Sequence, residues 1–214
     1  MTDSPDRYRR AVERFDDANR QDPNRTVVDG EEVADELLYA QRMSRWLERL
    51  ERGASEALRL AVRCQHLCRW MIPRSQYPMT RPGYHQWRST LARFHADQAA
   101  QILRDVGYDA ATVGRVQSLV RKEGLKTEPE AQTLEDVACL VFLENEFGDF
   151  AAKHDEQKVV GIVSKTWRKM SDRGRAVALA LDLPARERAL IEKALSPGAG
   201  GAAEGPLSPG GDSP

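Results

Sequence analysis

The chain has 214 residues, and its 41% hydrophobic content is enough to bury one substantial core. Its 32 Lys and Arg residues nearly balance its 33 Asp and Glu residues, so the overall charge does not indicate a protein that binds nucleic acid or a membrane surface. No apolar run approaches the roughly 20 residues of a membrane span, and the polar start MTDSPDRYRR excludes a secretory signal. With three cysteines that suit reduced thiols, we expect a cytoplasmic protein.

Apolar residues recur at three- and four-residue intervals along most of the chain, which is typical of amphipathic helices. Pro73, Pro78 and Pro82 exclude regular helix over 72–83, so we expect a rigid loop there. We find no alternating strand pattern and predict an all-α fold. The expected helices cover about 7–20, 33–51, 55–67, 84–107, 110–122, 131–147, 156–171 and 185–195.

The C-terminal segment SPGAGGAAEGPLSPGGDSP lacks the apolar area needed to offset the entropy lost on ordering. The sequence therefore predicts a single compact helical domain over 1–195 and a disordered tail rich in Pro, Gly and Ser over 196–214.

Two histidines and an aspartate stand out among the apolar helices. We expect His66 and His95 on successive long helices, and Asp136 on the apolar helix after them. Two imidazoles and a carboxylate that face one core form a ligand set for a borderline metal ion. The alternative is that the histidines are packed core residues and that Asp136 pairs with a cation, since a buried carboxylate must be paired or coordinated.

The proline loop and the residues after it contain Arg74, Arg81 and Arg88. Guanidinium groups suit phosphate and carboxylate because their donors form a flat fork. These arginines either bind an anionic ligand beside His66 and His95 or pair with acidic residues of neighbouring helices.

The chain resembles two families. Over about 7–195 it is similar to the uncharacterised domain-of-unknown-function family 4202, on the segments QHLCRWMIPR, YPMTRPGYHQWR, FHAD, LEDVACLVFLE and KTWRKMS. More distantly, its layout resembles the HD-domain metal-dependent phosphohydrolases. In that comparison LAVRCQHLCRW, FHADQAAQILRDVGYD and LEDVACLVFLE take the places of the histidine–aspartate doublet, of a third histidine and of an aspartate-bearing helix.

The HD resemblance implies that His66, His95 and Asp136 are metal ligands. Leu67 stands where the doublet aspartate is expected, and Arg42 lies roughly where the first histidine is expected. A metal site here therefore needs substitute ligands such as Gln65 or Glu135, or the pocket binds no metal.

Two functions follow. The first is a modified HD-like phosphohydrolase that acts on a small phosphorylated or nucleotide-like substrate. A divalent ion of Mn, Fe, Co, Ni or Zn on His66, His95 and Asp136 would polarise the phosphoryl group while Glu135 orients or deprotonates the water. The phosphate would bind to the guanidinium groups of Arg74, Arg81 and Arg88. The alternative is a non-catalytic regulatory protein that senses an anionic metabolite or nucleotide with a degenerate HD pocket.

Overall fold

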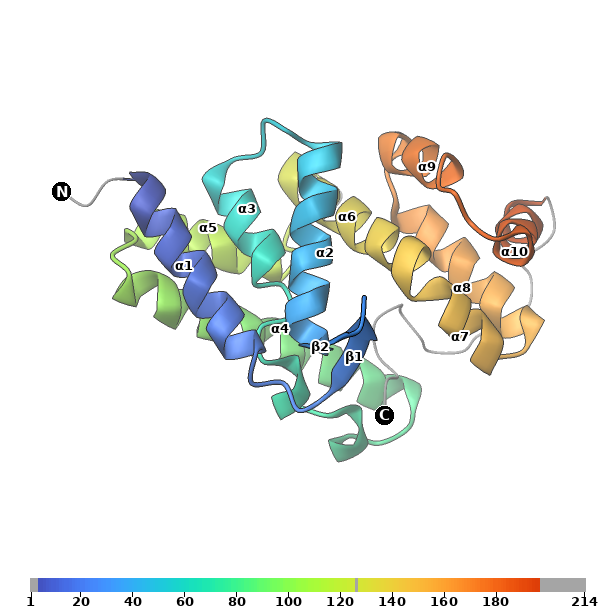
Figure 1. Cartoon of the computed structure of the whole chain (residues 1–214), viewed down its shortest axis with the longest axis horizontal. Helices are drawn as coiled ribbons and strands as arrows, with labels where there is room; N and C mark the ends of the chain where they lie inside the picture. Colours follow the sequence, from blue (N-terminus) through green and yellow to red (C-terminus); the bar gives the residue numbers. More distant parts are fainter. Residues whose placement is uncertain (1–3, 126, 197–214) are drawn as a thin grey trace. The chain divides into compact units, whose positions relative to one another are not determined.

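The computed structural model describes residues 4–125 and 127–196, and apart from one short hairpin their regular elements are helices (Figure 1). The prediction of an all-α fold is confirmed. These residues form two compact units, an N-terminal unit that ends at Leu134 and a C-terminal unit that begins at Glu135. The tail expected over 196–214 lies outside the described residues from 197 onward.

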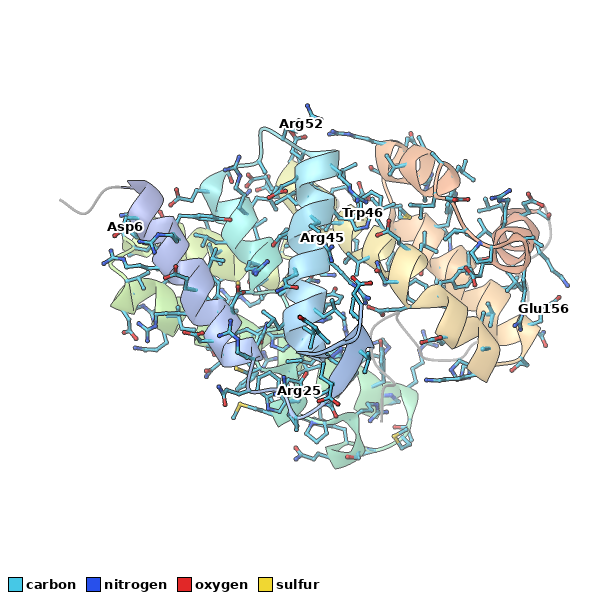
Figure 2. The ribbon with its side chains drawn as sticks, viewed as in Figure 1. Asp6, Arg25, Arg45, Trp46, Arg52 and Glu156 are labelled. Atoms are coloured by element: carbon cyan, nitrogen blue, oxygen red, sulfur yellow. The ribbon has the colours of Figure 1, made fainter. Side chains whose placement is uncertain are left out.

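The N-terminal unit is built from the helices α1 (Ser4–Asn19), α2 (Asp35–Leu50), α3 (Glu56–Arg63), α4 (Arg81–Asp105) and α5 (Ala110–Val120). The short helix α3 packs against α1, α2 and α5, and α4 packs against α5. Leu58, Leu60 and Val62 of α3 are almost fully buried, so this helix lies at the core of the unit. Trp46 of α2, labelled in Figure 2, is buried, and the guanidinium of Arg49 lies over its ring.

The hairpin of β1 (Arg25–Val28) and β2 (Glu31–Ala34) was not expected from the sequence. The strands are antiparallel, with Thr26 opposite Val33. Asp29 and Gly30 form the turn at φ 53° and 86°. An Asp-Gly pair is a strong signal for a two-residue hairpin turn, but strands of four mostly exposed residues leave no apolar alternation to read.

Several predicted boundaries agree with the structure because local capping sets them. The Ser55 hydroxyl accepts the amide of Leu58 at the start of α3, and Asp155 accepts the amide of Lys158 at the start of α8 (Glu156–Lys169). Gly107 follows α4 at φ 90°, as expected of a left-handed cap.

Two boundaries next to the expected site were wrong. The helix after the proline loop begins at Arg81, capped by Thr80, because proline is tolerated in the first turn of a helix and Pro82 does not delay it. The helix expected to reach residue 67 ends at Arg63, and the chain continues through turns to the left-handed Cys68 at φ 56°. His66 therefore lies in a turn and not on a long helix.

Helix α6 (Pro129–Asn145) begins in the N-terminal unit and continues into the C-terminal unit, which also contains α7 (Phe147–Lys153), α8, α9 (Asp172–Leu179) and α10 (Ala185–Leu195). Within that unit α8 packs against α10 and α7. In the two described ranges, no helix combines the length and apolar character required to cross a membrane.

Candidate functional site

The N-terminal unit contains a pocket of about 260 Å³ where the turn after α3, the helix α4 and the end of α5 meet. Residues from all three segments line it, so the tertiary fold assembles the pocket from distant parts of the sequence. Its polar lining includes Gln65, His66, Arg88, His95, Arg121 and Lys122.

His95 is a buried residue of α4 whose ring is held by the main chain. Its Nδ1 lies 2.8 Å from the carbonyl oxygen of Leu67. Burial lowers the pKa of His95 to about 3, although the Leu67 hydrogen bond acts in the opposite direction. Because a carbonyl only accepts, the proton of the neutral ring is on Nδ1, and Nε2 presents a lone pair.

His66 lies beside His95, with its side chain only 11% exposed. The ring centroids of the two imidazoles are 5.8 Å apart, and His66 stacks on Tyr39 at 4.2 Å. Its Nδ1 is 3.5 Å from an oxygen of Glu36, which is too long for a normal hydrogen bond. Burial, followed by the charge of Arg69, holds the pKa of His66 well below its usual range. Both imidazoles are therefore neutral at pH 7.

Three buried polar atoms of the pocket residues have no hydrogen-bond partner among the described residues. Two are acceptors, Nε2 of His95 and Oε1 of Gln65, and the third is the donor Nε of Arg121. Buried polar atoms are normally satisfied, and leaving one unpaired costs about 1–3 kcal/mol. Two such acceptors beside one pocket indicate a place where a ligand, an ion or water is bound.

The pocket is also cationic. Arg88 is half-buried, and no ion pair to its guanidinium occurs within residues 4–125 and 127–196. Arg121 and Lys122, which follow α5, also line the pocket, and Nε of Arg121 lies 2.9 Å from the carboxylate of Glu123 without the geometry of a hydrogen bond. The positive charges of Arg88 and Lys122 at this pocket suit an anionic ligand. Lys122 was not predicted, since the sequence shows only that a helix stops before Gly124.

The three arginines that the sequence singled out have different surroundings. The guanidinium of Arg74 donates to the carbonyl oxygens of Tyr77 at 3.0 Å and Pro78 at 2.8 Å, so it holds the proline loop together. Arg81 is the exposed first residue of α4. Of the three, only Arg88 lines the pocket with His66 and His95.

Asp136, expected to join the histidines, belongs to the C-terminal unit, where it anchors the start of α9. Its Oδ1 accepts the Ser171 amide at 2.8 Å, and the Ser171 hydroxyl donates to Oδ2 while accepting the amide of Gly174. A Cβ on Gly174 would lie 2.7 Å from Cγ of Asp136, so the helix approaches the carboxylate closely because this residue is glycine. This buried carboxylate is satisfied by hydrogen bonds.

Glu135, expected as a base, lies in the same unit with its carboxylate 3.7 Å from Nζ of Lys169. Across residues 4–125 and 127–196, no group of three or more His, Cys, Asp or Glu side chains is placed to hold a metal ion. A metal site that combines His66 and His95 with Asp136 stays a prediction.

Comparison with known proteins places the chain in a family. The model of the family described as "Domain of unknown function (DUF4202)" matches residues 9–191. The chain belongs to this family. For this DUF4202 chain, no curated protein and no solved structure gave a significant match.

Proposed function

We propose that the pocket of the N-terminal unit binds a small phosphorylated ligand and that the protein acts as a binding or regulatory protein. The observation that carries the proposal is the position of Arg88, a cation with no ion pair in the described ranges. It lines one pocket with the neutral His95, whose Nε2 has no partner there.

The two kinds of polar group in the pocket suit the two ends of such a ligand. Arg88 and Lys122 complement a phosphoryl dianion, to which guanidinium and ammonium groups form charge-assisted hydrogen bonds. Nε2 of His95 and Oε1 of Gln65 are acceptors, so they require a donor such as a ligand hydroxyl group. A phosphomonoester that carries hydroxyl groups satisfies both sets.

The size and lining of the pocket favour a small ligand. Its volume of about 260 Å³ lies below the roughly 300–1,000 Å³ of pockets that enclose drug-sized molecules. The aromatic rings in its lining are the imidazoles of His66, His85 and His95, and the lining has no larger ring of Phe, Tyr or Trp to cover a nucleobase. We therefore favour a small phosphorylated metabolite over an enclosed nucleotide, and a nucleotide would bind through its phosphate end.

Metal-dependent phosphohydrolysis is the second candidate, and the anchoring of His95 favours it. Metal-binding histidines commonly donate one ring nitrogen to a carbonyl or carboxylate and ligate with the other, as Leu67 and Nε2 would allow here. His66 and His95 would supply two nitrogen ligands for Mn, Fe, Co, Ni or Zn. Such an ion polarises a phosphoryl oxygen and activates water.

In this second candidate the resemblance to HD-domain hydrolases adds Asp136 as a ligand and Glu135 as the base. Two imidazoles are fewer than the three protein ligands usual in a catalytic site, so the ion would need Asp136, Gln65 or the substrate to complete its coordination. We rank this candidate second for that reason.

The decisive experiment measures ligand binding by calorimetry for the wild-type protein, Arg88→Ala and the matched control Arg81→Ala. The probes are inorganic phosphate, glycerol 3-phosphate and AMP, each with and without Mn²⁺. We expect Arg88→Ala to weaken binding of phosphate and glycerol 3-phosphate by at least about tenfold, the loss of one charge-assisted hydrogen bond. Arg81→Ala should change it less than about twofold.

His95→Ala separates the two candidates. If Mn²⁺ binds to the wild type, releases phosphate from a probe, and does neither with His95→Ala, the hydrolase replaces the binding protein. Binding without metal and without turnover supports the binding protein. If no probe binds at millimolar concentration, the pocket does not serve phosphorylated ligands and the proposal is overturned.

A further inference from the structure

Helices α4 and α5 end in the same capping motif but with different residues at its centre. After α4, the amide of Gly107 donates to the carbonyl oxygen of Arg104 at 3.0 Å, and the amide of Tyr108 donates to the carbonyl oxygen of Leu103 at 3.0 Å. After α5, the amide of Lys122 donates to the carbonyl oxygen of Leu119 at 2.9 Å, and the amide of Glu123 donates to the carbonyl oxygen of Ser118 at 3.0 Å. Both are Schellman motifs, which place one residue in the left-handed conformation.

That central position favours glycine. Gly107 occupies it at φ 90°, whereas Lys122 occupies it at φ 56°. A side chain with a Cβ is destabilised there because the Cβ crowds the carbonyl oxygen, and only short polar side chains such as Asn and Asp offset this by local hydrogen bonds. A lysine side chain is not of this short polar kind, so Lys122 makes this motif less stable than glycine would at the same position.

The two motifs differ in what lies beside them. Lys122 lines the pocket with Arg88 and His95, whereas Gly107 is not among the lining residues. The positive charge of Lys122 is one of those that keep the pKa of His66 low, which is consistent with its closeness to the pair of imidazoles. A strained residue that borders a pocket is typical of functional sites, where the surrounding structure holds it.

We propose that Lys122 is a ligand-binding residue, held in a left-handed conformation that suits glycine because this cap brings its ammonium group to the phosphoryl site of the pocket. The inference rests on the proposed function, and it assigns to the end of α5 a cation that works with Arg88.

The test combines stability and binding in four variants of the full chain. Lys122→Gly relieves the left-handed strain and removes the charge, so Tm should rise by about 2 °C while affinity for glycerol 3-phosphate falls at least about tenfold. Lys122→Ala removes the charge but keeps the strain, so affinity should fall equally without the rise in Tm. Lys122→Arg should keep affinity within about threefold.

Gly107→Ala is the reciprocal control. It introduces the same strain in a motif away from the pocket, so Tm should fall while affinity stays unchanged. If the wild type binds the probe and Lys122→Gly binds it equally well, the role of Lys122 is overturned and the proposed function stands. If Tm falls in Lys122→Gly, the claim that function opposes stability at this cap is overturned. If the wild type binds no probe, the proposed function and this role are overturned together.

Discussion

The carbonyl oxygen of Leu67 accepts a hydrogen bond from Nδ1 of His95 at 2.8 Å. The side chain of Leu67 is fully buried, so this residue serves the core with its side chain and the candidate site with its main chain. The predicted resemblance to HD-domain hydrolases would place an aspartate ligand at this position. The main chain of Leu67 orients the His95 imidazole and fixes which of its nitrogens is available.

The first prediction concerns acid stability. His66 and His95 both have a lowered pKa when folded, that of His95 falling from 6.5 to about 3. The unfolded chain therefore binds protons that the folded protein does not. Stability is complete above the unfolded pKa near 6.5 and is lost as the pH falls toward about 3. Between pH 7.5 and 5.5 protonation of the unfolded chain lowers the free energy of unfolding by about 1 to 2 kcal/mol for each histidine that stays neutral in the folded protein.

Urea unfolding at these two pH values measures this loss, which we expect to be about 3 kcal/mol for the pair. In His95→Gln one titrating ring is gone, and the pH-dependent loss should fall by about half. Equal stability at pH 7.5 and 5.5 in the wild type would mean that the imidazoles are protonated in the folded state.

The second prediction concerns Asp136. Asp136→Ala removes the acceptor of the Ser171 amide and hydroxyl, leaving these half-buried donors without that partner at the start of α9. We expect the free energy of unfolding to fall by about 1–3 kcal/mol. The control is Asp172→Ala at the fully exposed first residue of α9. It should change the free energy of unfolding by less than about 0.5 kcal/mol. If Asp136→Ala abolishes metal binding and leaves stability unchanged, Asp136 is a ligand and not a structural anchor.

The third prediction concerns Arg74, which the sequence grouped with Arg88. Arg74→Ala removes the donors to the carbonyls of Tyr77 and Pro78 and the contact with the Trp87 ring, 5.9 Å away. We expect a loss of about 1 kcal/mol in unfolding free energy and unchanged affinity for phosphate. Urea unfolding and calorimetry test the two parts. A tenfold weaker affinity with unchanged stability would assign Arg74 to the ligand.

The fourth prediction concerns the C-terminal segment, which lies outside the described residues. Its sequence contains Leu207 as its single large apolar residue after 196, so it has little surface to bury. Deleting 197–214 should leave Tm within about 2 °C of the full chain in a thermal melt. A larger fall would show that this segment docks on the rest of the protein.

Much of the fold could be predicted from the sequence because interactions between residues close in the chain determine it. Ser55, Asp155 and Gly107 mark helix ends because capping depends on residues three or four apart, which the sequence displays directly. The all-α class follows in the same way from the helical spacing of apolar residues. The same reasoning predicted that His66 and His95 face one core, since each belongs to an apolar segment that must pack there.

The surroundings of each polar side chain were decided only by the tertiary structure. Arg74 and Arg88 look alike in the sequence, but one faces the carbonyls of its own loop and the other lines a pocket. Lys122 enters the site because the end of α5 packs beside α4. Helical spacing defines which face of a helix is apolar, but not which neighbour covers it. Hydrogen-bond partners far apart in the chain, such as Leu67 and His95 or Asp136 and Ser171, therefore depend on packing that no local pattern encodes.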